Sequence, residues 1–208
     1  FPEQATNWAW IERLGAVLGA DRAADGTDGA PDAPALLNLF GYTGTASLVA
    51  ARAGFRVTHV DASRAALAWT KENLAASGLP ADALRLVLED AGAFVRREVR
   101  RGARYAGVLL DPPHYGRGPK GEKWQFEDHV ATLVAECERL LAPRSFLVIS
   151  TYAIGFSPIA LANLLEGLGG GRVVAGELAL PEEPLDGAPA RLLPAGSCAR
   201  LVRELDTD

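Results

Sequence analysis

The sequence contains no methionine, only two cysteines and no long apolar run. A membrane-spanning helix needs about 20 consecutive apolar residues, so the sequence excludes a helical membrane protein. Because Phe1-Pro2-Glu3-Gln4 is neither basic nor followed by an apolar core, we do not predict a signal peptide. Cys137 and Cys198 form no CxxC motif, and we expect reduced, buried thiols in a cytoplasmic protein. The lack of methionine at position 1 predicts a processed or truncated chain whose upstream segment is missing.

A surplus of basic charge is also missing. The net charge of −5 argues against a strong free-standing nucleic-acid binder, which would normally be basic. No three His or Cys residues have the spacing of a metal site, so no metal is predicted. Arginines nevertheless gather at one helix end, either as a solvated face favoured by the helix dipole or as a substrate-binding patch. They are Arg96, Arg97, Arg100, Arg101 and Arg104.

Short apolar runs alternate with longer amphipathic stretches through most of the 208 residues. Helices are predicted over 5–20, 44–53, 63–77, 91–101, 126–141 and 158–168, the fifth of them ended by Pro143. Strands are predicted at 36–40, 56–60, 84–88, 105–110, 146–150, 172–180 and 198–205. A Gly/Pro/Asp-rich linker covers 25–34, and a loop rich in proline and acidic residues separates the last two strands.

This alternation predicts the fold class. A strict strand–helix–strand order gives a parallel sheet with helices on both faces. Because no helix separates the last two strands, the final strand is expected to run antiparallel. We therefore predict an α/β, Rossmann-like, doubly wound fold with a mostly parallel seven-stranded sheet and an antiparallel final strand. Residues 1–35 form an N-terminal helix and linker and 36–208 the main domain, whose ligands should bind beyond the carboxyl ends of the strands.

A segment with two glycines, Phe40-Gly41-Tyr42-Thr43-Gly44-Thr45, lies between the first strand and its helix. Glycine lets the backbone approach a ligand closely, and a helix N-terminus offers free N–H donors. The G-x-x-G spacing differs from the G-x-G-x-x-G of dinucleotide enzymes, and no P-loop lysine follows. The segment is therefore either a ligand-binding loop or a tight structural turn.

Acidic residues follow the next two strands. Asp61 lies twenty residues after the first glycine of the loop, where a carboxylate can accept hydrogen bonds from both ribose hydroxyls of an adenosine cofactor. Asp90, which we prefer over Glu89, can meet an adenine amino group at the end of the third strand. Each aspartate also stands where a residue can cap the following helix, and the two roles can coexist. With the neighbouring Ala62 and Ala91, they predict a nucleoside pocket.

The fourth strand ends in Asp111-Pro112-Pro113-His114-Tyr115. The two prolines fix the backbone, and a carboxylate beside a fixed carbonyl suits a planar ring that bears N–H groups. A carboxylate at the end of a buried strand has a desolvation cost, which favours a functional role over a rigid turn. Asp111 and Pro112 are therefore predicted to orient the acceptor, a substrate ring that bears N–H groups. His114 is predicted to stack on the acceptor or take a proton, and Tyr115 to offer a stacking face.

The loop over 116–124 follows this motif and combines glycines, basic residues and Trp124. One interpretation is a mobile lid in which Arg117, Lys120 and Lys123 carry positive charge toward a negatively charged substrate, with Arg117 and Lys120 as the contacts. The other is an ordinary flexible loop whose Trp124 packs on the core.

Four segments together resemble a known family, the ribosomal large-subunit RNA methyltransferases. They are Leu37–Gly44, Val60–Ser63, Glu72–Leu79 and Leu110–Pro113. That family includes a cytosine-C5 methylase and a guanine-N7 methylase of 23S rRNA, and the resemblance covers about residues 36–205. It implies the architecture of a class I methyltransferase, a parallel sheet with an antiparallel final hairpin, so that 36–208 would be its catalytic domain.

The resemblance also implies the ligands. S-adenosylmethionine (SAM) would be the cofactor, with residues 40–44 around its methionine end, Asp61 at the ribose and Asp90 at the adenine. The entry segment Phe1–Gln4 would contact SAM as well. RNA would be the partner, and the missing upstream segment would be an RNA-binding domain.

The sequence departs from this family where cytosine-C5 methylation needs a thiolate to add to ring carbon six. The matching methylases have a cysteine just after the fifth strand, whereas this stretch reads Ile149-Ser150-Thr151-Tyr152. A threonine without an activating base does not replace a thiolate. Cys137 and Cys198 lie in a helix and in the last strand, away from a strand end that faces the site. A nitrogen acceptor fits better, because it already has a lone pair and needs only positioning and proton removal.

The predicted function is therefore SAM-dependent methylation of RNA at a ring or exocyclic nitrogen. Cytosine-C5 methylation, methylation of a small molecule or protein, and an inactive binding module are the alternatives. A nicotinamide-dependent oxidoreductase would need the G-x-G-x-x-G turn and would leave Asp111-Pro112-Pro113 without a role.

Overall fold

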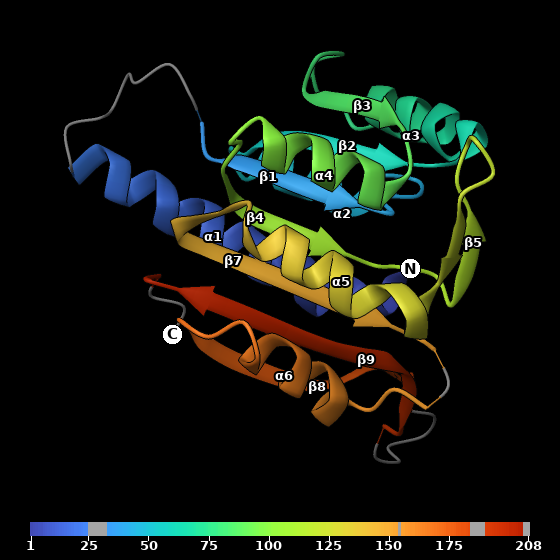
Figure 1. Ribbon diagram of the computed structural model, residues 1–208. Helices are drawn as coiled ribbons and strands as arrows, with labels where there is room; N and C mark the ends of the chain where they lie inside the picture. The colour runs from blue at the N-terminus through green and yellow to red at the C-terminus, as the bar shows by residue number, and fades with distance from the viewer. Residues whose placement is uncertain (25–32, 154, 184–189, 206–208) are drawn as a thin grey trace.

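The computed structural model describes residues 1–24, 33–153, 155–183 and 190–205. Most of the predicted 25–34 linker and the centre of the loop before the last strand lie outside these residues. The described chain forms one seven-stranded sheet with helices on both faces and a separate two-stranded hairpin (Figure 1). No helix in these ranges is long and apolar enough to cross a membrane.

The sheet has the strand order β3-β2-β1-β4-β7-β9-β8. Its first four strands along the chain are β1 (Ala35–Leu39), β2 (Arg56–Asp61), β3 (Leu84–Leu88) and β4 (Tyr105–Leu110), and the last three are β7 (Leu141–Thr151), β8 (Arg172–Pro181) and β9 (Leu192–Arg203). Neighbouring strands from β3 to β7 pair in parallel, and β9 pairs antiparallel with both β7 and β8. The predicted fold class is confirmed, including the antiparallel final strand.

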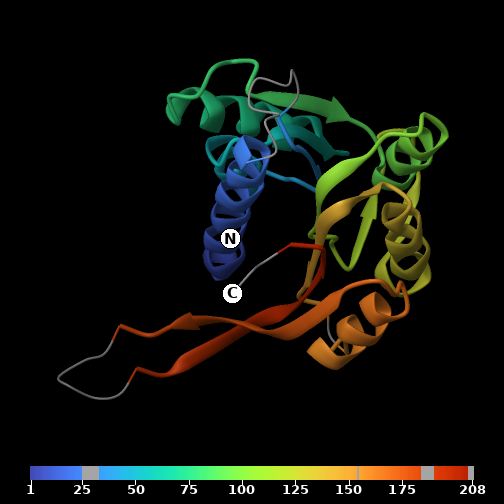
Figure 2. The same ribbon diagram turned by 90° about the vertical axis from the view of Figure 1, so that its left-hand side faces the viewer.

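Helices cover the sheet in two layers (Figure 2). One layer holds α1 (Ala5–Ala24), which follows the short 3-10 helix η1 (Pro2–Gln4), with α2 (Thr45–Arg52) and α3 (Arg64–Ala76); the other holds α4 (Ala91–Arg100), α5 (Phe126–Glu138) and α6 (Pro158–Glu166). The starts of three helices follow directly from the sequence. Side chains of Ser63, Asp90 and Ser157 accept hydrogen bonds from backbone N–H groups in the first turns of α3, α4 and α6.

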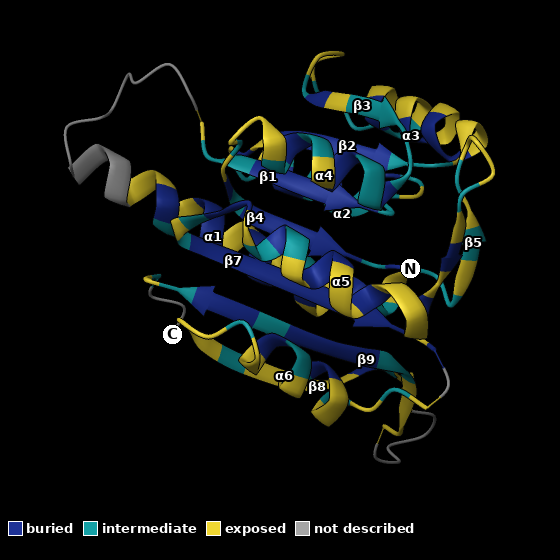
Figure 3. Cartoon of the chain, viewed as in Figure 1, coloured by how far each residue is buried: buried dark blue, intermediate teal, exposed yellow. Residues whose placement is uncertain are grey.

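The core has two parts, one on each face of the sheet, and most residues of the central strands β1, β4 and β7 are buried (Figure 3). Phe94 and Phe126 are fully buried in the layer of α4 and α5. On the other face, Phe146 of β7 packs edge-on against Trp10 of α1 and Phe55, with ring centroids 5.4 and 5.9 Å away. Because aromatic rings bury large apolar areas, α1 is held firmly against the sheet.

Two predicted boundaries are wrong near Pro143. The fifth long helix ends at Glu138, and β7 already begins at Leu141, so Pro143 lies inside a strand. The pairing of β4 with β7 shifts register over this stretch, between Tyr105 and Gly107. Proline is tolerated in a sheet at such irregularities, because the missing N–H leaves no ladder bond broken there. The proline therefore marks a strand irregularity and does not end the helix.

The loop predicted over 116–124 is also more regular than expected. Its ends form a β-hairpin of β5 (Tyr115–Arg117) and β6 (Lys123–Gln125), in which Tyr115 pairs with Gln125. The last strand begins at Leu192, earlier than predicted, and pairs with β8 in an arm that reaches beyond the other strands (Figure 2).

Candidate active site

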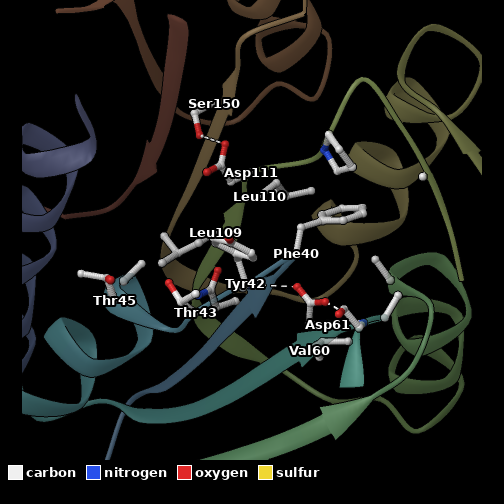
Figure 4. A pocket seen from close by; sticks show the side chains of 18 of the residues that line it. Phe40, Tyr42, Thr43, Thr45, Val60, Asp61, Leu109, Leu110, Asp111 and Ser150 are labelled. Atoms are coloured by element: carbon white, nitrogen blue, oxygen red, sulfur yellow. Dashed lines mark hydrogen bonds between the residues drawn. The ribbon is translucent and has the colours of Figure 1, made fainter. Parts of the chain in front are cut away.

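A cavity of about 440 Å³ opens at the carboxyl ends of β1, β2, β3 and β4 (Figure 4). Parallel strands end at the same edge of a sheet, so the loops that follow them converge there. Most of the predicted site residues line this cavity: Phe40, Gly41, Tyr42, Thr43, Asp61, Ala62, Asp90, Ala91, Asp111 and Arg117. Five others lie behind its wall or outside it: Gly44, Pro112, His114, Tyr115 and Lys120.

The loop after β1 has an unusual backbone. Phe40 and Tyr42 have positive φ angles of 55° and 49°, which non-glycine residues rarely adopt. At Gly41, an added Cβ would lie 2.4 Å from the imidazole of His59, so only glycine fits between this ring and the cavity. Such backbone strain is concentrated at functional sites, and it favours the interpretation as a ligand-binding loop.

His59 is fully buried, and its imidazole packs against Gly41 of this loop. Its Nδ1 lies 2.9 Å from Ser47 Oγ, and its Nε2 lies 3.5 Å from Thr70 Oγ1. Burial lowers the pKa of His59 from 6.5 to about 4, although the nearby Asp61 carboxylate acts in the opposite direction. The imidazole is therefore neutral at physiological pH and acts as a packing and hydrogen-bonding group.

The buried imidazole predicts acid sensitivity. In the unfolded chain His59 titrates near its ordinary pKa of 6.5, but in the folded protein it stays neutral down to a pH of about 4. Protons therefore bind the unfolded chain first, and the free energy of unfolding should fall by up to about 3 kcal/mol as the pH drops through this window. Urea denaturation at several pH values should show that His59→Gln loses this part of the decline. Equal pH slopes for the two proteins would contradict the assignment.

Asp61 has a fixed orientation at the end of β2. Its Oδ2 accepts a hydrogen bond from the Tyr42 N–H and its Oδ1 one from the Ser63 N–H, both at 2.8 Å (Figure 4). Ser63, and not Asp61, caps α3. Because each carboxylate oxygen can accept more than one hydrogen bond, Asp61 retains acceptor capacity toward the cavity.

Asp90 and Glu89 both line the cavity at the end of β3. Asp90 Oδ1 accepts a hydrogen bond from Ala93 N at 2.9 Å, so it caps α4 and still borders the cavity. The Glu89 carboxylate is instead paired with Arg97. Asp90 therefore remains the better candidate for contact with a base.

The arginines at the end of α4 are largely paired with acids. Arg97 pairs with Glu89. In addition, Arg101 Nη1 lies 3.1 Å from Glu98 Oε1, and Arg96 Nη1 lies 3.7 Å from Glu136 Oε2. These contacts favour the interpretation as a solvated helix face over a substrate patch.

Asp111 follows β4 and is partly buried. Its Oδ1 accepts a hydrogen bond from the Ser150 hydroxyl at 2.8 Å (Figure 4). Burial raises the pKa of this carboxyl, and the bond from Ser150 opposes the rise. Sequence reasoning did not assign Ser150 to the site, although its position at the end of the neighbouring parallel strand could have indicated it.

The residues after Asp111 form a rigid wall. Pro112 is buried, and the Pro113 carbonyl accepts a hydrogen bond from Trp124 Nε1–H at 2.7 Å. Trp124 is itself buried and packs on Phe40, with ring centroids 4.9 Å apart. The tryptophan thus anchors the β5–β6 hairpin to the core, as one of the two interpretations of this loop expected, and Arg117 borders the cavity from the hairpin.

His114 and the other predicted substrate contacts lie farther out. The His114 Nε2 is 2.6 Å from Glu127 Oε1 in the first turn of α5, and both side chains are exposed. Tyr115 is 77% exposed, and Lys120 is exposed in the hairpin turn. The structure therefore brings Asp111 to the cavity but not His114.

Neither thiol lines the cavity. Cys137 is fully buried near the end of α5, and burial raises the pKa of its thiol. Cys198 is buried in β9, where burial again raises the pKa and a hydrogen bond with Asn7 opposes the rise. Thr151, at the position expected for a catalytic cysteine, is buried and accepts a hydrogen bond from Ala153 N. A reactive thiolate is therefore not part of this cavity.

The N-terminal segment completes the cavity. Phe1, Gln4, Asn7 and Trp8 line it together with the strand-end residues. The resemblance implied that Phe1–Gln4 lies at the site, but nothing in the sequence pointed to Asn7, whose partners include Cys198 and Arg200 of the last strand.

The chain is similar in sequence and in fold to known methyltransferases. No family model matches the chain. A SAM-dependent methyltransferase from Agrobacterium tumefaciens is 41% identical, with a TM-score of 0.86 over 98% of this chain and 63% of its own. The chain therefore shares the fold of this SAM-dependent methyltransferase over nearly its whole length.

Two further proteins are similar to this chain. The ribosomal RNA large subunit methyltransferase K/L of Shewanella baltica is 37% identical over 119 residues, which are 55% of this chain but 16% of that protein. A methyltransferase structure complexed with S-adenosylhomocysteine, at 20% identity and a TM-score of 0.67 over 97% of this chain and 50% of its own, shares the fold. The domain thus resembles the ribosomal large-subunit methyltransferases but spans about a sixth of the length of the curated relatives.

Proposed function

We propose that this domain transfers the methyl group of SAM to a nitrogen atom of an RNA base. The observation that carries the proposal is the placement of two carboxylates, Asp61 and Asp111, on one cavity of about 440 Å³. A cavity of this size is in the range of small-molecule and cofactor sites.

The residues around Asp61 fit a nucleoside. Asp61 is oriented by two backbone N–H groups and can accept hydrogen bonds from a ribose diol. Asp90 borders the same cavity, where its carboxylate would meet the adenine amino group. The positive-φ loop at 40–44 leads into α2, whose N-terminal N–H groups suit the methionine carboxylate. SAM supplies an electrophilic methyl group on a sulfonium, which needs no metal or external oxidant.

The Asp111 carboxylate fits a nitrogen acceptor that carries hydrogens. The carboxylate would accept a hydrogen bond from an N–H of the base and would thereby orient the nitrogen lone pair toward the methyl group. With SAM bound, its methyl group would pass to this nitrogen, the electron pair of the broken S–C bond would stay on sulfur, and Asp111 would take the proton that the nitrogen loses. The wall of Pro112 and Pro113 keeps this carboxylate in place.

Exposed aromatic side chains at the cavity support RNA as the substrate. Phe1, Tyr42 and Tyr152 line the cavity, yet their side chains are 69%, 48% and 62% exposed. Exposed rings beside a site are stacking surfaces for unpaired bases, and Arg117 adds a positive charge for the phosphate backbone. A ribosomal RNA substrate also fits the cytoplasmic location that the cysteine content predicts.

The alternatives are less well supported. Cytosine-C5 methylation needs a thiolate, and neither cysteine borders the cavity. A small-molecule or protein substrate would leave the exposed aromatic rim without a role. We further propose that the catalytic domain comprises the predicted residues 36–208 together with the segment before β1, which lines the cavity, and that a longer chain supplies a separate RNA-binding domain.

The proposal is tested by incubating the purified chain with methyl-labelled SAM and total bacterial RNA. Label should enter RNA, and nuclease digestion followed by mass spectrometry should show an N-methylated nucleoside. A C5-methylated cytidine, or label in protein or small molecules alone, would overturn the assignment of the acceptor. Failure of SAM to bind in calorimetric titration would overturn the methyltransferase assignment itself.

A further inference from the structure

A chain of hydrogen bonds runs from Arg200 of β9 to Asp111 through the N-terminal segment. Arg200 donates from Nη2 and Nε to Asn7 Oδ1, at 2.6 and 2.9 Å. Asn7 Nδ2 donates to Gln4 Oε1 at 2.7 Å, and Gln4 Nε2 donates to Ser150 Oγ at 2.9 Å. Ser150 then donates to Asp111 Oδ1 at 2.8 Å. Three parts of the chain distant in sequence, the N-terminal η1 and α1, the strand β7 and the strand β9, are thus linked to one carboxylate.

The direction of every bond in this chain is fixed by its first member. A guanidinium has only donors, so Asn7 must turn its oxygen toward Arg200 and its nitrogen toward Gln4. Gln4 must then accept with its oxygen and donate with its nitrogen. With a lone pair of its oxygen occupied by that donor, the Ser150 hydroxyl turns its single hydrogen toward Asp111. From Arg200 onward, each side chain therefore donates a hydrogen bond to the next, and the last donor, the Ser150 hydroxyl, donates to the Asp111 carboxylate.

The members of the chain have little freedom to rearrange. Gln4, Asn7 and Ser150 are all buried. Arg200 is held from one side by the Trp10 ring, whose centroid lies 4.7 Å from the guanidinium carbon. In a poorly solvated environment, successive hydrogen bonds polarise one another, so the chain acts on Asp111 as a unit.

We propose that Arg200, Asn7, Gln4 and Ser150 are positioning residues that hold Asp111 as an ionised acceptor with one oxygen occupied and the other turned to the substrate. This inference rests on the proposed function, since it explains how Asp111 can receive an N–H of the acceptor. It also makes the segment before β1 a part of the catalytic machinery. Apolar side chains at these positions would serve packing alone equally well. The aligned donors instead end on Asp111, the carboxylate proposed to bind the methyl acceptor.

The charges that face Asp111 define what a pH measurement must separate. Burial raises its pKa and the Ser150 hydrogen bond lowers it, while the Glu3 carboxylate raises it and the amino group of Phe1 lowers it. The Cys198 thiol, also within electrostatic reach of Asp111, has a raised pKa because it is buried. Glu3 changes the charge near Asp111 without being a member of the chain, so it provides a matched control.

The decisive variant is Gln4→Glu, which keeps the shape of the side chain but replaces its donor by an acceptor. The Ser150 hydroxyl can then donate to the introduced carboxylate instead of Asp111. The pKa of Asp111, followed by NMR of carbon-13-labelled aspartate and assigned with Asp111→Asn, should rise in Gln4→Glu and in Ser150→Ala. Glu3→Gln, which removes a negative charge, should lower it. Methyl transfer to RNA at neutral pH should fall about ten-fold in Gln4→Glu, as expected for one lost hydrogen bond to a charged group.

Asn7→Asp interrupts the same chain one step earlier, and it replaces Gln4→Glu if that variant does not fold. An Asp111 pKa that rises in Ser150→Ala but in neither Gln4→Glu nor Asn7→Asp would overturn the relay, because Ser150 would then act alone. An unchanged pKa in all three variants would overturn it too. The NMR readout needs no methyl acceptor, so it tests the relay even if the proposed RNA substrate is wrong.

Discussion

Replacing Asp61 by alanine is expected to weaken SAM binding about 100-fold or more. Hydrogen bonds to a charged group contribute about 1.5–3 kcal/mol each, and a ribose diol offers two of them to one carboxylate. The substitution also removes the acceptor that holds the Tyr42 and Ser63 N–H groups, so the loop after β1 loses its anchor. Isothermal titration calorimetry with SAM measures the change in Kd directly.

A matched control separates this effect from general damage. Asp82 is an exposed aspartate in the turn before β3, and Asp82→Ala should bind SAM as the unaltered chain does. Asp61→Asn retains one side-chain oxygen and should fall between the alanine variant and the unaltered chain. If Asp61→Ala binds SAM with unchanged affinity and an unchanged melting temperature, the cofactor does not lie against β2 and the proposed cavity assignment fails.

Replacing Asp111 by asparagine is expected to lower the rate of methyl transfer about 100-fold or more while SAM affinity changes little. Asparagine can still accept the hydrogen bond from Ser150, but it lacks the charge that orients an acceptor N–H and takes its proton. Loss of one preorganised polar group in an active site commonly costs a factor of 100 to 1000, roughly, in rate. Single-turnover transfer of labelled methyl groups to RNA, with saturating SAM, measures this step.

The same variant should be at least as stable as the unaltered protein. Burial raises the pKa of Asp111, so the folded state binds its proton more tightly than the unfolded chain does. The ionised carboxylate therefore destabilises the fold at neutral pH, and this cost decreases as the pH falls toward the raised pKa. A melting temperature that rises or holds while the rate falls marks a residue kept for function. A rate unchanged in Asp111→Asn would show that another group orients the acceptor.

Much of the fold was predictable because its signals are local. The alternation of apolar runs with amphipathic stretches is a property of neighbouring residues, and it placed β3 at Leu84–Leu88 and β4 at Tyr105–Leu110 as the structure has them. The missing helix between the last two strands likewise predicted the antiparallel β9. The prediction failed at Pro143, where a strand irregularity tolerates a residue that usually ends a helix.

The hairpin after β4 shows why other features were not predictable. Its strands have three residues each, too few to show a period of alternation. Trp124 fixes the hairpin by donating to the Pro113 carbonyl and packing on Phe40. That choice between a free lid and an anchored hairpin depends on contacts across the fold.

By itself, the sequence determined the doubly wound sheet and the line of candidate residues at strand ends, among them Gly41, Asp61, Asp90 and Asp111. It could do so because in a parallel sheet each strand's carboxyl end lies at the same edge, so position along the chain translates into position in space. Only the tertiary structure decided which side chains act together. Arg200 lies 193 residues from its partner Asn7, and His114 turns to Glu127 and away from the cavity. Such pairings depend on packing between elements far apart in the chain, which no local pattern encodes.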